Sequence, residues 1–560
     1  MKKITFSILI TVVYFLQLSV FMPSCNAQVP NWEWVKSYGI VAMDGAYSIS
    51  SDANGNTYVT GLFFSPTLVF DAITLTNTDS TGNTSDFYIA KFNADGDVLW
   101  AKSASGSTFD EGVSVGVDGN GNAYVTGNYS SPTITFGSNT LASTTTSEGV
   151  FDVFLVKYDT AGNVIWAKTA GGDMYDVAKS IYVDVNGNSY LTGDFKSSVM
   201  TFGDTTLANN YTSSRDIFFA KYDVNGNMIW ATCAGGDGDD VSCNIYVDVN
   251  GNVYATGSFK CDFIVFGSIV LLRSGSPPNN CDFFVVKFDN SGNTIWAKRA
   301  GNFETGRTSY VVADPGGNVY LTGGFKGSDI TFGNILLTNS YTSNDIFAVK
   351  YDPTGNVLWA KSVGDIGDDL STCSFVDVFG NFYITGEFGS SNITFGSTTL
   401  TNTGFKDIFI TKYDALGNVV WAKNNGGLDL ERFRSCTFDA SGNAYYAGMT
   451  NSLSIDFDGI SLSQSEIVIG KLGHATGIDK LTSESNALTI YPNPVQNELT
   501  IENNTATIQN FEIINFMGQT VYSSIIDKKV VIDMGQLAIG VYIVKLYSDK
   551  TALVRKFVKQ

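Results

Sequence analysis

The sequence predicts an all-β protein built from one repeated unit, and three observations support this. Seven tryptophans recur from Trp34 to Trp421 at steps of 66, 66, 64, 66, 63 and 62 residues. Short alternating apolar segments are separated by Gly-Asn pairs, which are typical of strands joined by tight turns. Glycine is plentiful, at 57 residues, and charged residues are sparse, at 16%. A period this long indicates a supersecondary unit that must stack on its neighbours to bury its apolar face.

The first 27 residues have the features of a secretory signal peptide. Two lysines precede an apolar stretch from Ile4 to Phe21, and Cys25-Asn26-Ala27 supplies small residues at the cleavage position. The alternatives are a retained membrane helix and a lipoprotein anchored at Cys25, although Met22-Pro23-Ser24 is a poor lipidation sequence. No second long apolar run follows, so we expect no membrane span in the mature protein.

The second repeat shows how each unit is built. Strands are expected over 113–118, 123–127, 152–157 and 164–168, with Gly-Asn turns inside the first and second pairs. An excursion containing Thr135-Phe136-Gly137 lies between the second and third strands. Each repeat therefore predicts a four-stranded antiparallel sheet.

The tryptophans are offset from the other repeated motifs by one strand. The repeats begin with a lone strand at Trp34 and end, after Lys471, without one. If the Trp34 strand completes the last sheet, hydrogen bonds between the chain ends close a ring and remove its open edges. We therefore predict a seven-bladed β-propeller with four-stranded blades, closed by the Trp34 strand. A linear β-solenoid is the alternative, but it does not explain the offset.

These repeats resemble the seven-bladed β-propeller (SBBP-like) repeats of secreted and surface bacterial proteins. The resemblance covers about Trp32 to Leu472 and rests on Gly-Asn-x-Tyr-x-x-Gly, Asp-x-Phe-x-x-Lys and the tryptophan strand. The final copy departs from the pattern at Ser465-Glu466-Ile467 and Ala447. The resemblance implies a fold and no particular reaction.

Charge and composition divide the chain into a propeller over 28–472, a linker over 473–486 and a tail over 487–560. Residues 28–472 contain 24 Lys and Arg against 46 Asp and Glu, a net charge of −22, whereas the tail has 7 against 6. Nucleic acids and anionic membranes need a basic surface, so we expect neither as a partner.

The tail predicts about seven short strands, typical of a small Ig-like β-sandwich. It contains Tyr491-Pro492-Asn493-Pro494, then Met517-Gly518-Gln519, then Gly540-Val541-Tyr542. In order and spacing these motifs resemble the type A C-terminal sorting domain of the type IX secretion system. The resemblance implies export across both membranes, the secretion machinery as a partner, and a secreted or cell-surface protein. A small sandwich that binds carbohydrate is the alternative.

An acidic residue stands eight positions before the aspartate that ends nearly every first strand. The set comprises Asp44, Asp110, Asp176, Asp240, Asp369 and Glu431, with Glu304 two residues before the exception, Gly306. In a propeller this position should surround one mouth of the central channel, where carboxylates could hold a cation such as calcium or attract a basic ligand. Alternatively, each carboxylate accepts backbone N–H bonds within its own loop.

Some repeats depart from their siblings. Arg307, Arg432 and Arg434 place cations in the otherwise acidic loops of the fifth and seventh repeats, where they could form asymmetric ligand loops. Cys261 and Cys281 occur together in one repeat, at the end of one strand and the start of the next, which predicts a local disulfide. The cysteines at 233, 243, 373 and 436 are expected to be small buried residues.

Histidine is nearly absent, since His474 in the linker is the only one. This excludes a Ser-His-Asp, Cys-His or multi-histidine metal site in the propeller. We expect a monomeric, non-enzymatic module without a cofactor that binds an extracellular glycan, peptide or envelope partner. The alternatives are a carboxylate-based glycoside hydrolase or lyase, which needs only two carboxylates, and a structural surface-layer component.

Overall fold

The computed structural model describes residues 29–39, 43–104, 106–145, 149–209, 211, 214–274, 281–303, 307–326, 329–339, 341–439, 442–473, 488–504, 509–515, 520–535, 537, 540–547 and 552–559. The expected signal peptide, His474, Glu304 and Gly518 lie outside these residues.

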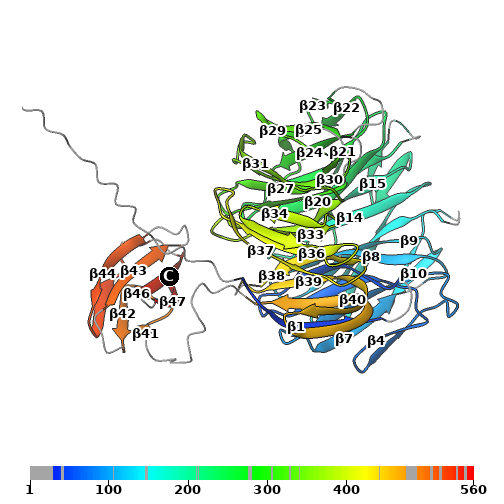
Figure 1. The fold of residues 1–560 in the computed structure, drawn as a ribbon. Coiled ribbons are helices and arrows are strands. Elements are labelled where there is room, and N and C mark those ends of the chain that lie inside the picture. Colours follow the sequence, from blue (N-terminus) through cyan, green and yellow to red (C-terminus); the bar gives the residue numbers. More distant parts are fainter. Residues whose placement is uncertain are drawn as a thin grey trace, which may run out of the picture.

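All regular structure in the described residues is β, and no helix among them has the length and apolar character that a membrane crossing needs. Between Trp32 and Leu472 the described strands form seven four-stranded antiparallel sheets, which stand side by side in Figure 1. We number the sheets in the order of their first strands. The prediction of an all-β chain with four-stranded sheets is confirmed.

The strands of each sheet follow one another along the chain, except in the seventh sheet. The first strands are β2 (Gly45–Ser51), β8 (Asp110–Val117), β14 (Asp176–Val183), β20 (Asp240–Val247), β26 (Arg307–Ala313), β32 (Asp369–Val376) and β38 (Glu431–Phe438). The second strands are β3 (Thr57–Phe63), β9 (Ala123–Tyr129), β15 (Ser189–Phe195), β21 (Val253–Phe259), β27 (Val319–Lys326), β33 (Phe382–Phe388) and β39 (Ala444–Phe457). The third strands are β6 (Asp86–Phe92), β12 (Asp152–Tyr158), β18 (Asp216–Tyr222), β24 (Cys281–Phe288), β30 (Asn344–Tyr351), β36 (Asp407–Tyr413) and β40 (Ile460–Leu472).

The fourth strands carry the repeated tryptophans. Those of the first six sheets are β7 (Val98–Ala104), β13 (Val164–Ala170), β19 (Met228–Ala234), β25 (Thr294–Phe303), β31 (Val357–Val363) and β37 (Val419–Asn425). The N-terminal strand β1 (Trp32–Tyr38) pairs antiparallel with β40, with Trp34 opposite Lys471, so it supplies the fourth strand of the seventh sheet.

The excursion between the second and third strands is a short hairpin. The six hairpins are β4–β5 (Thr67–Phe70, Ile73–Thr76), β10–β11 (Thr133–Phe136, Asn139–Ala142), β16–β17 (Val199–Phe202, Thr205–Ala208), β22–β23 (Phe263–Phe266, Ile269–Leu272), β28–β29 (Ile330–Phe332, Ile335–Leu337) and β34–β35 (Asn392–Phe395, Thr398–Thr401). In the seventh sheet β39 and β40 extend to make the same hairpin. Its phenylalanine, such as Phe136, is buried against the rings of two sheets, Phe87 and Phe154.

The core lies between neighbouring sheets. One buried cluster joins Tyr58, Ile89 and Trp100 of the first sheet to Val125 and Phe154 of the second, and similar clusters follow along the chain. Each first strand lies beside the first strand of the next sheet, and β38 lies beside β2. We call each interface between two neighbouring sheets a junction.

The C-terminal residues form two sheets. One contains β41 (Leu488–Tyr491), β42 (Glu498–Asn503) and β45 (Lys529–Asp533), and the other contains β43 (Gln509–Asn515), β44 (Thr520–Ile526), β46 (Gly540–Tyr547) and β47 (Ala552–Lys559). A buried cluster joins the two sheets through Leu499, Ile532, Phe511 and Val544. This is the arrangement of a small sandwich, in which the inward faces of two sheets share one core.

Candidate functional site

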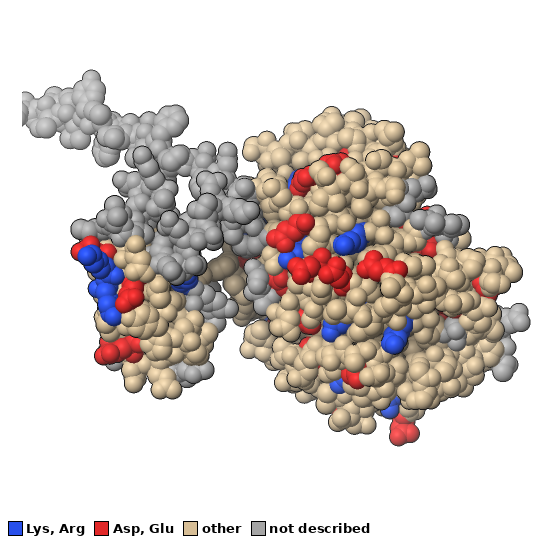
Figure 2. Space-filling model, turned by 90° about the horizontal axis from the view of Figure 1, so that it is seen from below, with Lys and Arg blue, Asp and Glu red and all other residues tan. Residues whose placement is uncertain are grey.

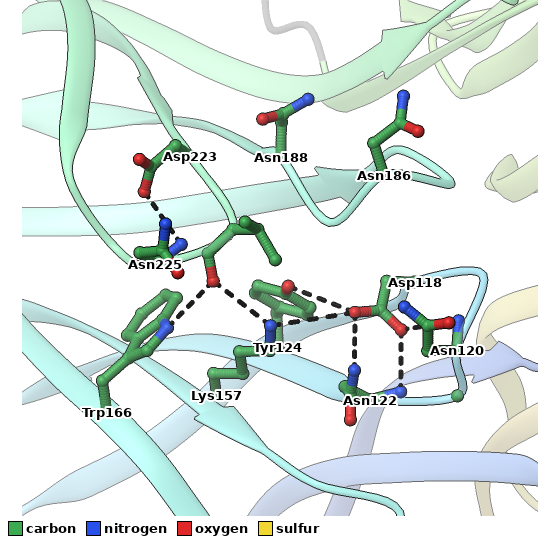
Figure 3. Close-up of polar contacts among 12 residues, drawn as sticks. Asp118, Asn120, Asn122, Tyr124, Lys157, Trp166, Asn186, Asn188, Asp223 and Asn225 are labelled. Carbon is green, nitrogen blue, oxygen red and sulfur yellow. Dashed lines mark hydrogen bonds and ion pairs between the residues drawn. The ribbon is translucent and has the colours of Figure 1, made fainter.

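The residues repeated in every sheet hold neighbouring sheets together. In Figure 3, Lys157 Nζ and Trp166 Nε1 both donate to the carbonyl of Val224 in the next sheet, over 3.2 Å each. The same ammonium lies 4.8 Å above the centre of the Tyr124 ring and 3.8 Å from Asp118 Oδ2. Such cation–π contacts stabilise desolvated pairs.

Six of the seven repeated tryptophans, all but Trp421, are also covered by a glycine of the next sheet. Gly226 has a positive φ of 77°, and a Cβ there would meet the Trp166 ring at 3.0 Å. At the other end of the repeat, Trp34 Nε1 donates to the carbonyl of Ala94 over 3.0 Å, and Gly96 packs on its ring. The repeated tryptophans therefore pack between sheets and do not present their faces to a ligand.

The Asp-x-Asn-Gly-Asn segments are hairpin turns. Asp118 Oδ1 accepts the backbone N–H groups of Asn120 and Asn122 over 2.9 Å each, and Oδ2 accepts the Asn122 side chain over 2.8 Å (Figure 3). These Asx-type bonds use the carboxylate within its own loop.

The predicted acidic ring is buried, and its carboxylates face their own sheets. Asp176, with no exposed surface, accepts the backbone N–H groups of Lys196 and Ser197 over 3.1 Å and the Ser197 hydroxyl over 2.7 Å. Asp44, Asp110, Asp240, Asp369 and Glu431 have the same kind of partners on the following strand or loop. Burial raises the pKa of Asp176 to about 7 and that of Asp240 to about 8.

The arrangement matches the alternative in which each carboxylate organises its own loop. Within the described ranges, no three His, Cys, Asp or Glu side chains form a group that could hold a metal ion. Glu304, the seventh proposed member, lies outside those ranges.

A second carboxylate stands beside each of these, contributed by the preceding sheet, and it is buried in every case except Glu466. Asp152, at the start of β12, raises the pKa of Asp176 by its charge, and Asp86 acts in the same way on Asp110. At the junction between the seventh and first sheets, burial is the main cause that raises the pKa of Glu466, and the charge of Asp44 raises it further. Paired buried carboxylates favour sharing a proton.

The structure corrects the predicted disulfide. Cys261 is a free thiol whose Sγ lies 3.0 Å from Asp240 Oδ1, in the place that a serine hydroxyl occupies in five of the other sheets. Cys261 therefore replaces the serine found at the equivalent positions and donates to Asp240 in its place. The disulfide instead joins Cys373 on β32 to Cys436 on β38.

Two adjacent positions of the first strand behave differently. The first position lies four residues before the aspartate that follows each first strand. At six of the seven junctions its side chain accepts a backbone N–H of the next sheet. The pairs are Ser48 with Val115, Ser114 with Ile181, Ser180 with Ile245, Asn244 with Val311, Cys373 with Cys436 and Ser435 with Ile49. At the remaining junction this position is Tyr310. A bulge precedes it in six sheets, and in the fifth sheet the bulge lies one residue earlier, at Thr308.

The position before it differs in every sheet. Its residues are Tyr47, Val113, Lys179, Cys243, Ser309, Thr372 and Arg434. Because the sheets otherwise repeat one another, this variation is the clearest departure from symmetry among the first strands.

Of the predicted arginines, Arg434 occupies this position and Arg432 lies two residues before it. Arg434 stacks on Tyr47 of the first sheet, with its guanidinium 4.6 Å from the ring centre. Arg432 pairs through Nε and Nη2 with Glu387 of the sixth sheet, and Lys406 Nζ lies 2.7 Å from the same carboxylate. Burial opposes ionisation of Glu387, but both cations outweigh it and hold its pKa below the usual range. Arg307 lies in β26, and its side chain is outside the described atoms.

Arg434 has no such partner. Its Nε is buried and, within the described residues, has no hydrogen-bond partner. The described arginines at 215, 273, 299 and 432 each have a carboxylate within 4 Å. Tyr310 of the fifth sheet lies close enough for the charges of Arg434 and Arg432 to lower its pKa, although burial raises it more. On the face seen in Figure 2 charged side chains are few, and both signs lie interspersed near the middle.

Sequence reasoning found Arg432 and Arg434 but missed Tyr47, Tyr310, Glu387 and Lys406. The available signal was the residue type at matched first-strand positions, where serine recurs and Tyr310 does not. Glu387 and Lys406 carried no signal, because their meeting with Arg432 depends on how the sixth and seventh sheets pack.

The tail motif is ordered around its first tyrosine. Tyr491 Oη donates to Glu502 over 2.6 Å, and Lys529 lies 5.3 Å from the centre of the Tyr491 ring. Asn493 Oδ1 accepts the backbone N–H of Val558 over 2.9 Å. Both Pro492 and Pro494 follow cis peptide bonds. Gly540 begins β46 opposite Lys559.

Residues 489–560 match the family described as the secretion system C-terminal sorting domain. This confirms the expected sorting domain and points to type IX secretion, with export to the cell surface or extracellular space.

Two curated relatives match the chain at low identity. The uncharacterized WD repeat-containing protein L264 of Acanthamoeba polyphaga mimivirus is 22% identical over 88% of this chain and 41% of its own length. The regulatory protein FlaEY of Caulobacter vibrioides is 23% identical over 47% of this chain and 28% of its own length. The chain thus spans less than half of either relative.

Solved structures are similar only in part. Sqt1 from Chaetomium thermophilum has a TM-score of 0.36 at 8% identity, covering 84% of this chain and 97% of that one. YCF48, solved with a D1 peptide, has a TM-score of 0.35 at 9% identity, covering 81% of this chain and all of that one.

Proposed function

We propose that residues 28–472 form a seven-bladed β-propeller carried to the cell exterior by the tail, and that β1 closes the ring. The pairing of β1 with β40 supports closure, as do the contact of β38 with β2 and the bond from Ile49 N to Ser435 Oγ. A closed ring has no open sheet edge at the meeting of its ends.

We further propose that the protein is a binding module. Its site around Arg434 and Tyr47, here called the central site, takes an anionic group of an extracellular ligand. The observation that carries this proposal is Arg434, whose buried Nε has no partner among the described atoms. Leaving such a donor unpaired costs about 1–3 kcal/mol or more, so a bound group or water is expected to satisfy it.

The chemistry of the site favours a carboxylate. The Arg434 guanidinium lies over the Tyr47 ring, and the planar N–H fork of a guanidinium matches the two oxygens of a carboxylate. Arg432, two residues before Arg434 on the same strand, shares the Glu387 carboxylate with Lys406. Tyr47 and Arg434 both retain some solvent exposure.

The test is calorimetry of the purified protein with oligogalacturonate, a carboxylate-bearing glycan, and with inorganic sulfate. We expect saturable binding of oligogalacturonate that weakens about tenfold or more in Arg434→Gln, since a charged hydrogen bond contributes about 1.5–3 kcal/mol. Arg215→Gln, which removes a partly exposed arginine paired with Asp239, is the matched control and should bind normally.

Two outcomes would overturn the proposal. Absence of saturable binding by either anion would mean that water alone satisfies Arg434. Release of shortened oligosaccharides from the same mixture would favour the alternative of a polysaccharide-degrading enzyme. An unchanged melting temperature in Arg434→Gln separates lost binding from lost folding.

A further inference from the structure

A polar cavity of about 260 Å³ lies where the fourth strand of the fifth sheet, β31, meets the hairpin strand β34 of the sixth. Its lining includes Tyr341, Asp345, Ser362, Asp365, Asn392 and Thr394. Binding pockets for small molecules typically measure about 300–1,000 Å³, so this cavity suits one small ring.

The floor of the cavity contains a carboxylate with an unused oxygen. Asp345 is 6% exposed, and its Oδ1 has no hydrogen-bond partner in the described part of the chain. In the first and sixth sheets the loop caps the other oxygen of the equivalent carboxylate: Asp86 Oδ2 accepts the backbone N–H of Thr78 over 2.8 Å, and Asp407 Oδ2 accepts that of Thr403 over 3.1 Å. Burial and the charges of Asp369 and Asp365 raise the pKa of Asp345 to about 7.

A glycine of the cavity wall packs directly against this oxygen. A Cβ at Gly364 would lie 2.2 Å from Asp345 Oδ1, so any other residue there would displace the carboxylate. Opposite, Asn392 Oδ1 accepts the Thr401 hydroxyl over 2.9 Å, and the hydroxyls of Thr394 and Thr399 lie 3.0 Å apart. These bonds hold an amide and a hydroxyl at the rim.

An aromatic ring completes the rim. Tyr341 is 42% exposed, and its backbone N–H is fixed by Asn339 Oδ1 over 2.9 Å. Tyrosine combines a flat apolar face with a polar edge, which suits a ligand that has both. The nearby carboxylates of Asp345 and Asp365 disfavour an acidic ligand.

We infer that this cavity binds one residue of a neutral saccharide, with the sugar face on Tyr341 and a sugar hydroxyl donating to the Asp345 carboxylate. A sugar supplies several O–H donors and acceptors on a ring with apolar faces. The hydroxyl donor meets the Asp345 carboxylate, and Asn392 and Thr394 serve the remaining hydroxyls. This site is separate from the central arginines and takes a ligand of different charge.

The third sheet provides a matched control. Its loop also exposes a tyrosine, Tyr211, and the Oδ1 of Asp216 is likewise unpartnered within the described residues. Phe263 and Cys233, however, stand where the fifth-sheet site has Asn392 and Ser362. Comparing the third-sheet and fifth-sheet loops therefore shows whether binding needs the polar rim as well as the tyrosine and the carboxylate.

The experiment is ligand-observed NMR of the purified full chain with glucose, galactose, mannose and N-acetylglucosamine, followed by calorimetry. We expect saturable binding of at least one sugar, weakened about tenfold in Asp345→Asn and at least fivefold in Tyr341→Ala. Tyr211→Ala and Arg434→Gln should leave it unchanged.

No saturable binding by any of the four sugars would overturn the inference. Binding that survives both Asp345→Asn and Tyr341→Ala, or that is lost in Tyr211→Ala, would also overturn it. Because Tyr341 is exposed, its variant is expected to fold, and an unchanged melting temperature would establish this. If only the central-site proposal fails, the unmodified protein will bind a sugar but no oligogalacturonate.

Discussion

The junction between the sixth and seventh sheets differs from that between the seventh and the first. At the seventh-to-first junction, Trp34 reaches the Ala94 carbonyl and Ser435 accepts from Ile49, as at the internal junctions. At the sixth-to-seventh junction, Trp421 Nε1 is buried and has no partner in the described residues. The loop that would accept it does not exist, because β1 supplies the outer strand of the seventh sheet.

Other contacts replace the missing one. The sixth-to-seventh junction has the Cys373–Cys436 disulfide, the Arg432–Glu387 ion pair, and Phe375 stacked on Phe438 at 3.9 Å between ring centres. The residues that break the repeat are therefore partly structural: they stabilise the junction next to the chain ends. Arg434 and Tyr341 are not explained in this way, which is why we assign ligands to them.

Removing the disulfide should have the largest effect. It closes a loop of 63 residues, and the chain-entropy model gives about 4 kcal/mol for a loop of this length. Cys373→Ser, or reductant, should lower the melting temperature, while Cys233→Ser should not. A melting temperature insensitive to reductant would show that this junction does not depend on the covalent bond.

The paired carboxylates at the junctions predict that stability falls as the pH rises. Burial raises the folded-state pKa of Asp176 to about 7, above its unfolded value of about 3.9. The stabilisation is therefore complete below about pH 4 and is lost as the pH rises through 7, by at most about 4 kcal/mol for one carboxyl.

Melting temperatures between pH 4 and 8 would test this. The decline should be smaller in Asp176→Asn. It should be unchanged in Asp79→Asn, because loop hydrogen bonds lower the pKa of Asp79 and it stays ionised over this range. A melting temperature that increases from pH 4 to 8 would contradict the prediction.

The smallest effect compares ring closure with an internal junction. Ser435→Ala and Ser48→Ala each remove one acceptor for a backbone N–H of the next sheet, over 3.2 Å in both cases. Each should cost about 1 kcal/mol in the free energy of unfolding, measured by urea titration. If only Ser48→Ala destabilised the protein, the ends would not meet in solution.

Local sequence predicted the strands well. In the second repeat the strand expected over 123–127 is β9, Ala123–Tyr129, because alternation and Gly-Asn turns act within a few residues. The excursion proved to be a hairpin, β10–β11, whose phenylalanine fills the space between sheets. Its four-residue strands are too short for alternation alone to identify.

The site was harder to predict. The acidic positions were identified correctly as a recurrent set, but whether Asp176 faced a channel or its own loop depended on the position of Ser197. The disulfide was assigned to Cys261 and Cys281 because they share a repeat. Its actual partners, Cys373 and Cys436, occupy adjacent positions of consecutive first strands and meet only when two sheets pack.

The sequence alone determined the number of tryptophans, the four-stranded unit, the offset of Trp34 and the identity of the tail, since turn chemistry and strand alternation are local. Tertiary structure decided which polar groups were satisfied. Partners such as Ser48 and Val115 lie 67 residues apart, and only sheet packing determines whether Asp345 and Arg434 find one. The unpaired groups define the candidate ligand sites, because burial without a partner is a property of the folded protein.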